Sequence, residues 1–290
     1  DVPTDFILPG NGSSELISLL IETRAPKRTL ILGPTYSEYS RELSFSGSTQ
    51  DYYHLQEAED FELDVEDLCR TLLNGYDFLI LCNPNNPTSS AILKDEMRAL
   101  LSFCANRDIF VMIDETYVEF APSVQEVTAV PYTKDFSNLM VLRGVSKFYA
   151  APGMRFGYGI TGNKEFLSQM KEKQIPWSLN SLGAYAGEQM FKDTSYIRQT
   201  RSLILTERDR MFLELKKLSS FKVYFPYGNF ILVKILKPEV TSFDVFEACI
   251  KEGLMIRDCS SFQCLDGEFI RFCIMKPEDN NRLLKVLKTI

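Results

Sequence analysis

Short apolar runs alternate with amphipathic segments through the first 160 residues of the chain. The runs are rich in β-branched and other apolar residues, which is typical of buried strands; they cover residues 28–33, 77–82, 109–114, 139–144 and 156–160. Between them, apolar side chains recur at helical spacing in residues 13–23, 65–75 and 95–107. This alternation predicts an α/β fold with a mostly parallel central sheet covered by helices.

The pattern changes in the last third of the chain. Residues 180–218 carry one continuous helical pattern, and after Ser220 short strand patterns alternate with two helical ones. We therefore expect a large domain over residues 1–200 and a smaller α+β domain over residues 201–290. Because the sequence opens on Asp1 rather than on a methionine, we also expect an N-terminal arm to precede it.

Charge and hydropathy narrow the classes of partner. The net charge is −7 at pH 7, which gives no long-range attraction to nucleic acid. No apolar run approaches the roughly 20 residues that a membrane-spanning helix requires. We therefore expect neither a nucleic acid nor a membrane as partner.

Cysteine and histidine usage narrows the chemistry. The seven cysteines are scattered, and several lie in apolar runs, which favours free thiols in a reducing cytoplasm. Only Cys259 and Cys264 lie near each other, and no companion pair has zinc spacing, so we expect no metal site. The single histidine, His54, argues against Ser-His hydrolases and His-ligated metal enzymes. Lysine becomes the leading candidate for proton transfer.

Polar residues follow several of the predicted strands, where ligands bind in parallel α/β sheets. The segment NPNNPT (83–88) follows one strand, Asp114 ends another, and Ser146 and Lys147 follow a third, among small and apolar neighbours. The turn GNGSSE (10–15) leads into a helix, whose N-terminus offers N–H groups to an anion.

Each of these features also has a plain explanation as a turn, a helix cap or a solvated lysine. Taken together they suit a ligand that carries a phosphate, an amine-reactive aldehyde, a phenolic oxygen and a ring nitrogen. That ligand is pyridoxal 5′-phosphate (PLP).

The order of GNGSSE, PTY, NPNNPT, DETY, SK…GMRFGY and IRF resembles the fold-type-I PLP-dependent aminotransferase superfamily (class I and II). The resemblance runs from about residue 10 to the C-terminus and implies a three-layer fold. Two segments, 141–160 and 173–193, look more like the L-threonine-O-3-phosphate decarboxylases of cobalamin biosynthesis than like histidinol-phosphate aminotransferases. The sequence departs from the family pattern at Ser89, where glycine is usual, and at Gly144, where a hydroxyl residue often helps bind the phosphate.

The resemblance implies a role for eleven residues. Lys147 would bond covalently to the cofactor aldehyde, Asp114 would pair with the ring nitrogen, and Tyr117 would hydrogen-bond the phenolic oxygen. The other contacts to the cofactor would come from Ser13, Ser14, Ser146 and Arg155 at the phosphate, Tyr36 stacked on the ring, and Asn86 at the phenolic oxygen. Arg271 and Arg257 would hold the substrate carboxylate, with Asn86 beside them.

The resemblance also implies the reaction. The leading hypothesis is decarboxylation of O-phospho-L-threonine to (R)-1-aminopropan-2-yl phosphate by a cytoplasmic homodimer. The alternative enzyme is a histidinol-phosphate or related aminotransferase that passes the amino group to 2-oxoglutarate. An alternative of another class is a regulator whose domain binds PLP without catalysis, although nothing in the sequence resembles a DNA-binding module. No motif distinguishes decarboxylation from transamination.

Overall fold

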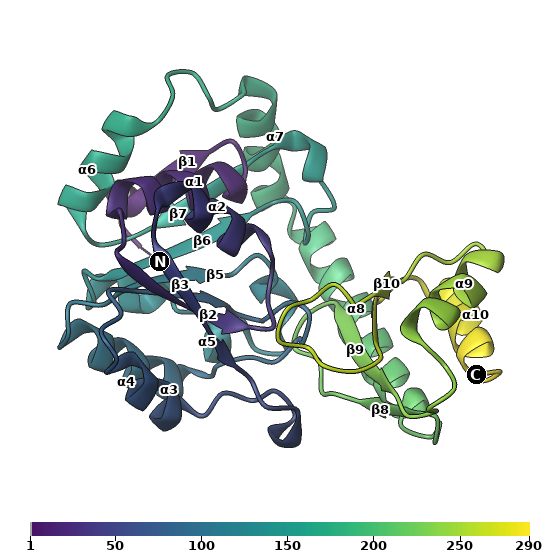
Figure 1. The fold of residues 1–290 in the computed structure, drawn as a ribbon. Coiled ribbons are helices and arrows are strands. Elements are labelled where there is room, and N and C mark those ends of the chain that lie inside the picture. Colours follow the sequence, from purple (N-terminus) through teal and green to yellow (C-terminus); the bar gives the residue numbers. More distant parts are fainter. Residues whose placement is uncertain (1) are drawn as a thin grey trace.

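Two β-sheets organise the chain in the computed structural model, which describes residues 2–290 (Figure 1). The larger sheet has seven strands in the order β1-β7-β6-β5-β4-β2-β3. Strands β2 to β6 pair in parallel, whereas β7 is antiparallel to both β6 and β1. The strands are β1 Ile7–Gly10, β2 Arg28–Gly33, β3 Thr49–His54, β4 Phe78–Cys82, β5 Phe110–Asp114, β6 Leu139–Gly144 and β7 Gly157–Ile160. The predicted mostly parallel sheet is confirmed.

Helices cover both faces of this sheet because its strands are apolar on both sides. In β4, Ile80 packs against one set of helices while Leu79 and Leu81 pack against the other, as the two-residue period of a strand requires. One face carries α1 Ser13–Arg24, α2 Glu38–Ser46 and α6 Lys164–Lys173. The other carries α3 Val65–Leu72 and α4 Lys94–Ala105, with the short α5 Val124–Val127 packed against α4.

The smaller sheet is antiparallel throughout and has the strand order β10-β11-β9-β8. Its strands are β8 Phe221–Val223, β9 Phe230–Ile235, β10 Arg257–Asp258 and β11 Phe269–Cys273. Helix α7 Ser181–Lys192 lies beside the larger sheet, where its Phe191 packs against Tyr158 of β7 (Figure 1). The helices of the smaller half are α8 Thr194–Leu215, α9 Ser242–Lys251 and α10 Pro277–Leu287. Short 3₁₀ turns complete the chain: η1 Thr4–Phe6, η2 Glu57–Glu59, η3 Val118–Phe120, η4 Val130–Lys134 and η5 Pro152–Met154.

A buried arginine ties the two halves together. Arg208 of α8 is 1% exposed and donates to the carbonyls of Phe120 in the first half (3.0 Å) and Tyr227 in the second (3.1 Å). Helix α8 thus contacts η3 as well as β8, β9 and α10. The predicted boundary at residue 200 lies inside this helix, so the position of the domain boundary stays a prediction.

The hydrophobic pattern alone missed several elements and merged two others. The predicted continuous helix is interrupted at Asp193, whose side chain accepts a hydrogen bond from the Tyr196 N–H and thereby starts α8. Strand β3 was not predicted because it lies at the sheet edge, where none of its side chains is fully buried. Helix α2 was also missed, although it supplies one wall of the cavity described below.

Two findings concern the chain as a whole. All seven cysteines are free thiols. Across residues 2–290, every helix is too short or too polar to cross a membrane.

Candidate active site

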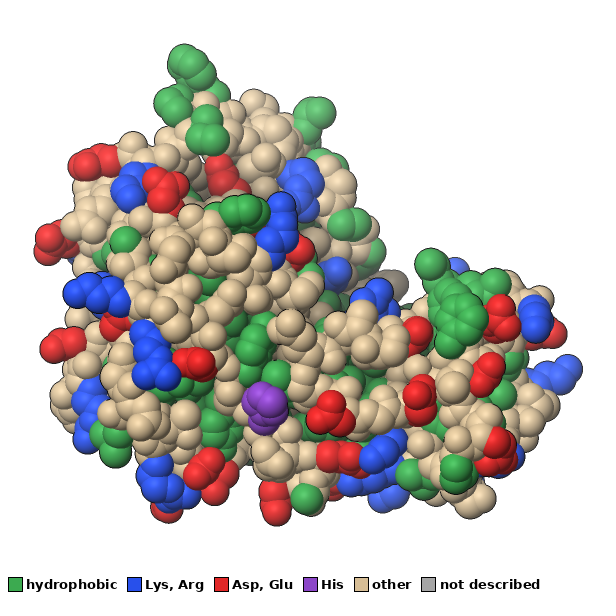
Figure 2. Space-filling view, in the orientation of Figure 1, with side chains coloured by type: hydrophobic (Ala, Val, Ile, Leu, Met, Phe, Trp, Pro, Cys, Tyr) green, Lys and Arg blue, Asp and Glu red, His purple; other side chains and the backbone are tan. Residues whose placement is uncertain are grey.

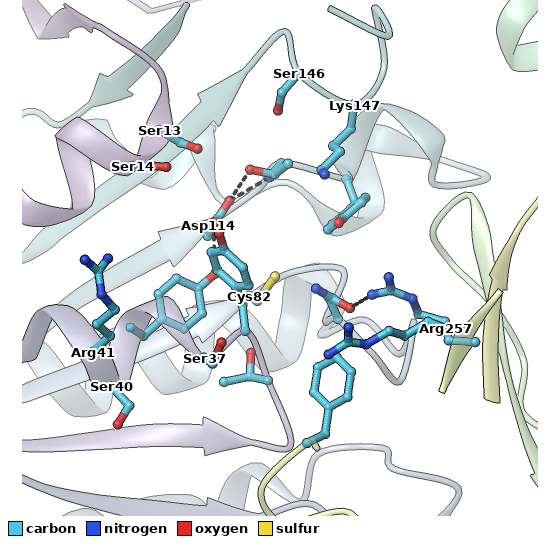
Figure 3. A pocket seen from close by; sticks show the side chains of 18 of the residues that line it. Ser13, Ser14, Ser37, Ser40, Arg41, Cys82, Asp114, Ser146, Lys147 and Arg257 are labelled. Atoms are coloured by element: carbon cyan, nitrogen blue, oxygen red, sulfur yellow. Dashed lines mark hydrogen bonds between the residues drawn. The ribbon is translucent and has the colours of Figure 1, made fainter. Parts of the chain in front are cut away.

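A cavity of about 650 Å³ lies at the carboxyl ends of β2, β4, β5 and β6, facing the smaller sheet. All eleven residues singled out from the sequence line it: Ser13, Ser14, Tyr36, Asn86, Asp114, Tyr117, Ser146, Lys147, Arg155, Arg257 and Arg271. Figure 3 shows Ser146 and Lys147 on one side of Asp114, and Arg257 across the cavity from them. The structure therefore brings together residues up to 258 positions apart (from Ser13 to Arg271) in one place.

Asp114 is held by three donors at the end of β5. Its Oδ1 accepts from the Thr116 N–H (2.9 Å) and the Thr116 hydroxyl (2.5 Å), and its Oδ2 accepts from the Tyr39 hydroxyl at 2.8 Å. The residue is 4% exposed. A buried carboxylate that accepts hydrogen bonds from three donors has a fixed direction. It suits a cationic N–H in the cavity.

Lys147 reaches into the cavity from the turn that follows β6 (Figure 3). The neighbouring Phe148 is buried, and its carbonyl accepts from the Tyr196 hydroxyl at 2.8 Å, which anchors the turn. The Lys147 side chain itself is exposed, although its sequence neighbours are small or apolar. The expectation of an apolar setting is therefore wrong for the side chain, because its neighbours turn inward while the amine faces the open cavity.

The start of α1 forms one end of the cavity. Gly12 occupies the N-cap position with φ of 84°, and no side chain caps this end of the helix. A Cβ on Gly12 would lie only 2.5 Å from Nη2 of Arg155, which itself holds φ of 48°. A Cβ on Gly157 would likewise lie 2.7 Å from the Ser13 nitrogen. Glycine at both positions lets Arg155 and β7 approach the N–H groups of the helix, an arrangement suited to an anion.

Two tyrosines line the cavity next to Asp114. Burial raises the pKa of the Tyr117 phenol, which packs edge-on against Phe230 with ring centroids 4.9 Å apart. The pKa of Tyr36 is also raised, first by burial and then by the charges of Glu38 and Asp114. Both phenols therefore remain protonated near neutral pH and can donate hydrogen bonds.

Two arginines from the smaller sheet form the opposite wall. Arg271 donates from Nη1 to Asn86 Oδ1 and lies over the Phe230 ring, 5.1 Å from its centroid. Its Nε is buried and has no partner among residues 2–290. Arg257 is exposed and donates to the Ser261 hydroxyl at 2.9 Å. The orphaned N–H of Arg271 favours an anionic ligand, since an unpaired buried donor is costly.

The profile of the family described as aminotransferase class I and II matches residues 2–287. The chain belongs to this family. It is 31% identical over 289 residues to a threonine-phosphate decarboxylase of Salmonella typhimurium, covering 100% of this chain and 78% of that protein. It is 28% identical over 288 residues to a histidinol-phosphate aminotransferase of Methanococcus aeolicus, covering 99% and 76%.

Solved structures agree with this assignment. The crystal structure of the histidinol-phosphate aminotransferase from Clostridium acetobutylicum superimposes with a TM-score of 0.91 at 33% identity, covering 98% of this chain and 83% of that one. The chain is therefore an enzyme of the class I and II aminotransferase family, with the fold-type-I architecture expected from its motifs.

The residues of this class I/II enzyme fit PLP, the cofactor on which the family depends. The uncapped helix start with Arg155 and Ser146 offers donors to a phosphate, and the Lys147 amine offers a nucleophile to an aldehyde. Asp114 has a fixed carboxylate for a protonated ring nitrogen. Gly144, which replaces a hydroxyl residue of the family pattern, has little room for a side chain, because a Cβ there would lie 3.3 Å from the Phe156 carbonyl.

The sequence reasoning missed other residues that line the cavity: Ser37, Ser40, Arg41, Tyr39, Cys82 and Thr116. Tyr39 had only a local signal, because it is a second tyrosine three positions after Tyr36 and their rings pack edge-on. Thr116 could have been found from its place two residues after Asp114. The remaining missed residues had no signal in the sequence, because only the fold brings them to the cavity.

Proposed function

We propose that this enzyme binds PLP and decarboxylates O-phospho-L-threonine to (R)-1-aminopropan-2-yl phosphate. The observation that carries the proposal is one cavity in which Lys147 and Asp114 face two arginines, Arg257 and Arg271. This arrangement supports a substrate with an amino group and more than one negative charge. The choice of decarboxylation is supported by the likeness of residues 141–160 and 173–193 to threonine-phosphate decarboxylases and by the Salmonella relative.

Eight residues would hold the cofactor beside Lys147. When bound, PLP supplies an aldehyde that joins to an amine and a ring that takes up the electron pair of a bond broken at Cα. Asp114 would keep the ring nitrogen protonated, and Tyr117 would donate to the phenolic oxygen. The remaining contacts would be Ser13, Ser14, Ser146 and Arg155 at the phosphate and Tyr36 against the ring face. Asn86, shared with Arg271, would contact both the cofactor and the substrate.

The arginines would decide which bond at Cα breaks. A bond breaks most readily when it stands perpendicular to the plane of the conjugated ring. A guanidinium that holds the carboxylate out of that plane therefore favours loss of CO₂, whereas one that holds it in the plane favours loss of the Cα proton. After loss of CO₂, Lys147 Nζ would return a proton to Cα.

The second candidate is a histidinol-phosphate aminotransferase, favoured by the match to the Clostridium acetobutylicum structure. Both reactions use a phosphorylated amine and the same cofactor contacts. The experiment gives the purified enzyme O-phospho-L-threonine, and separately histidinol phosphate with 2-oxoglutarate. Release of CO₂ and the phosphorylated amino alcohol supports decarboxylation. Formation of glutamate without release of CO₂ contradicts decarboxylation and supports transamination instead.

We further propose that the enzyme is a homodimer that acts in the cytoplasm, in cobalamin biosynthesis. Large apolar side chains are exposed around the α6–α7 connection: Ile175, Trp177, Leu182 and Tyr185. Hydrophobic side chains protrude there in Figure 2, at the top of the view. Exposed apolar groups of this kind favour burial against a second copy. Light scattering of the purified protein tests the dimer, and a monomer at micromolar concentration contradicts it. The free cysteines are compatible with a reducing compartment.

A further inference from the structure

Tyr39 links the acidic group of the cavity to its aromatic wall. Its side chain is fully buried, and its hydroxyl donates to Asp114 Oδ2 at 2.8 Å. The same ring packs edge-on against Tyr36, with centroids 5.6 Å apart and planes at 86°. One side chain on α2 thus touches both the carboxylate at the end of β5 and the ring proposed to stack on the cofactor.

The number of acceptor positions on Asp114 limits what else it can bind. An ionised carboxylate has about four lone-pair positions, two on each oxygen. Thr116 fills two on Oδ1, and Tyr39 fills one on Oδ2. One position on Oδ2 is left for the cavity, which is what a single ring N–H needs. Without the Tyr39 hydroxyl, Oδ2 would have two open positions, and only the Thr116 contacts to Oδ1 would orient the carboxylate.

Tyr39 can act only as a donor in this contact. Burial raises the pKa of its phenol well above the ordinary value, and the negative charge of Asp114 raises it further. The neighbouring Cys82 thiol also has a raised pKa, because it is buried and lies near Asp114, so it too stays uncharged. Neither the Tyr39 phenol nor the Cys82 thiol therefore carries a negative charge at neutral pH.

We propose that Tyr39 is a positioning residue that directs Asp114 Oδ2 at the ring nitrogen of the cofactor. This inference rests on the proposed function, because it requires PLP in the cavity. It predicts that the Tyr39 hydroxyl contributes to cofactor affinity only when the cofactor has a ring nitrogen. A cofactor whose ring nitrogen is replaced by carbon has no N–H for Asp114. Its dissociation constant should therefore not change when that hydroxyl is removed.

The test compares Tyr39→Phe with the unaltered enzyme in binding of PLP and of its 1-deaza analogue. Dissociation constants are measured by absorbance titration of the stripped protein, without any turnover. We expect Tyr39→Phe to weaken the binding of PLP about tenfold, in line with the loss of a hydrogen bond to a charged group. The affinity for the analogue should change less than about twofold. With phosphothreonine, kcat should fall while KM changes little.

The matched control is Tyr224→Phe. Tyr224 is also buried, and its hydroxyl donates to the Glu57 carboxylate at 2.8 Å, away from the cavity. Its replacement should leave both dissociation constants unchanged. Tyr39→Met, which also removes the hydroxyl, repeats the comparison if the phenylalanine variant does not fold.

Equal weakening of PLP and the analogue by Tyr39→Phe would assign Tyr39 a merely structural role and overturn the inference. Unchanged affinity for both would overturn it as well. Failure of the unaltered enzyme to bind PLP would instead refute the proposed function, so the two failures are distinguishable.

Discussion

Arg257 and Arg271 lie directly opposite one another in β10 and β11, and both side chains line the cavity. Like charges opposite each other in adjacent strands destabilise a sheet. Each guanidinium is partly compensated by an aromatic ring, Phe262 for Arg257 and Phe230 for Arg271. A bound anion between them would remove the remaining repulsion, which explains why two cations are kept side by side.

The two arginines should contribute unequally to substrate recognition. Arg271→Gln should lower kcat/KM for phosphothreonine by about 100-fold, because Arg271 is the more buried and a charged hydrogen bond there is worth about 3 kcal/mol. Arg257→Gln should lower it by about tenfold. Steady-state kinetics measures both effects. Both variants should retain PLP, and loss of the cofactor from Arg271→Gln would show that this arginine holds the cofactor rather than the substrate.

Lys147→Ala should abolish covalent attachment of the cofactor, since no other amine is proposed to reach the aldehyde. The measurement is borohydride reduction followed by intact mass, in which the unaltered enzyme gains one reduced cofactor and the variant gains none. The control is Lys192→Ala on α7, where Lys192 is exposed and pairs with Glu188, and it should label like the unaltered enzyme. A labelled Lys147→Ala protein would rule out this lysine as the attachment point.

Ser89 combines a strained backbone with a buried hydrogen bond. Its φ is 60°, a region that favours glycine, and its hydroxyl accepts from the Gly228 N–H at 2.8 Å. Ser89→Ala removes the hydrogen bond and keeps the strain, so we expect a loss of about 2 kcal/mol in the free energy of unfolding. Ser89→Gly relieves the strain, so its loss should be about 1 kcal/mol smaller.

Urea unfolding of the two Ser89 variants gives the comparison directly. The paired substitutions differ by one methyl group at a fully buried position. If the alanine variant were as stable as the glycine variant, the left-handed backbone would carry no cost at this position.

Glu119 should make stability depend on pH. Burial raises the pKa of its carboxyl from 4.5 to about 7, against the favourable charge of Arg143. Because the folded state binds this proton more tightly than the unfolded state, stability falls as pH rises from about 4.5 to about 7 and then levels off. The stability lost on ionisation is moderated because the Glu119 side chain is 21% exposed to solvent.

Glu119→Gln tests this relationship because the amide never ionises. Relative to the unaltered enzyme, the free energy of unfolding of the variant should be about 1 kcal/mol higher at pH 8, which corresponds to about 2–4 °C in melting temperature. At pH 5 the two proteins should be nearly equally stable. Glu126→Gln is the control, since Glu126 is 47% exposed and pairs with Lys94 on the surface. A gain of equal size at both pH values would exclude ionisation of Glu119 as its cause.

The site residues at the strand ends could be predicted from the sequence, because parallel strands place their carboxyl ends at one edge of the sheet. Asp114 and Lys147 each follow a buried apolar run, so their meeting follows from the sheet order. Tyr39 could not be placed in the same way. It lies on α2, whose apolar pattern is weak, and its hydroxyl reaches Asp114 only because α2 packs on the sheet face that also buries Phe110 and Met112 of β5.

By itself, the sequence determined the parallel sheet, the strand ends that carry chemistry and the family to which the chain belongs, because these depend on periodicity and on motifs that are local in the chain. The tertiary structure decided which side chains share a wall. Asn86 meets Arg271 across 185 residues, and Arg257 faces Arg271 through the register of two short strands. The first contact depends on how the two sheets pack and the second on strand register, and no local pattern encodes either.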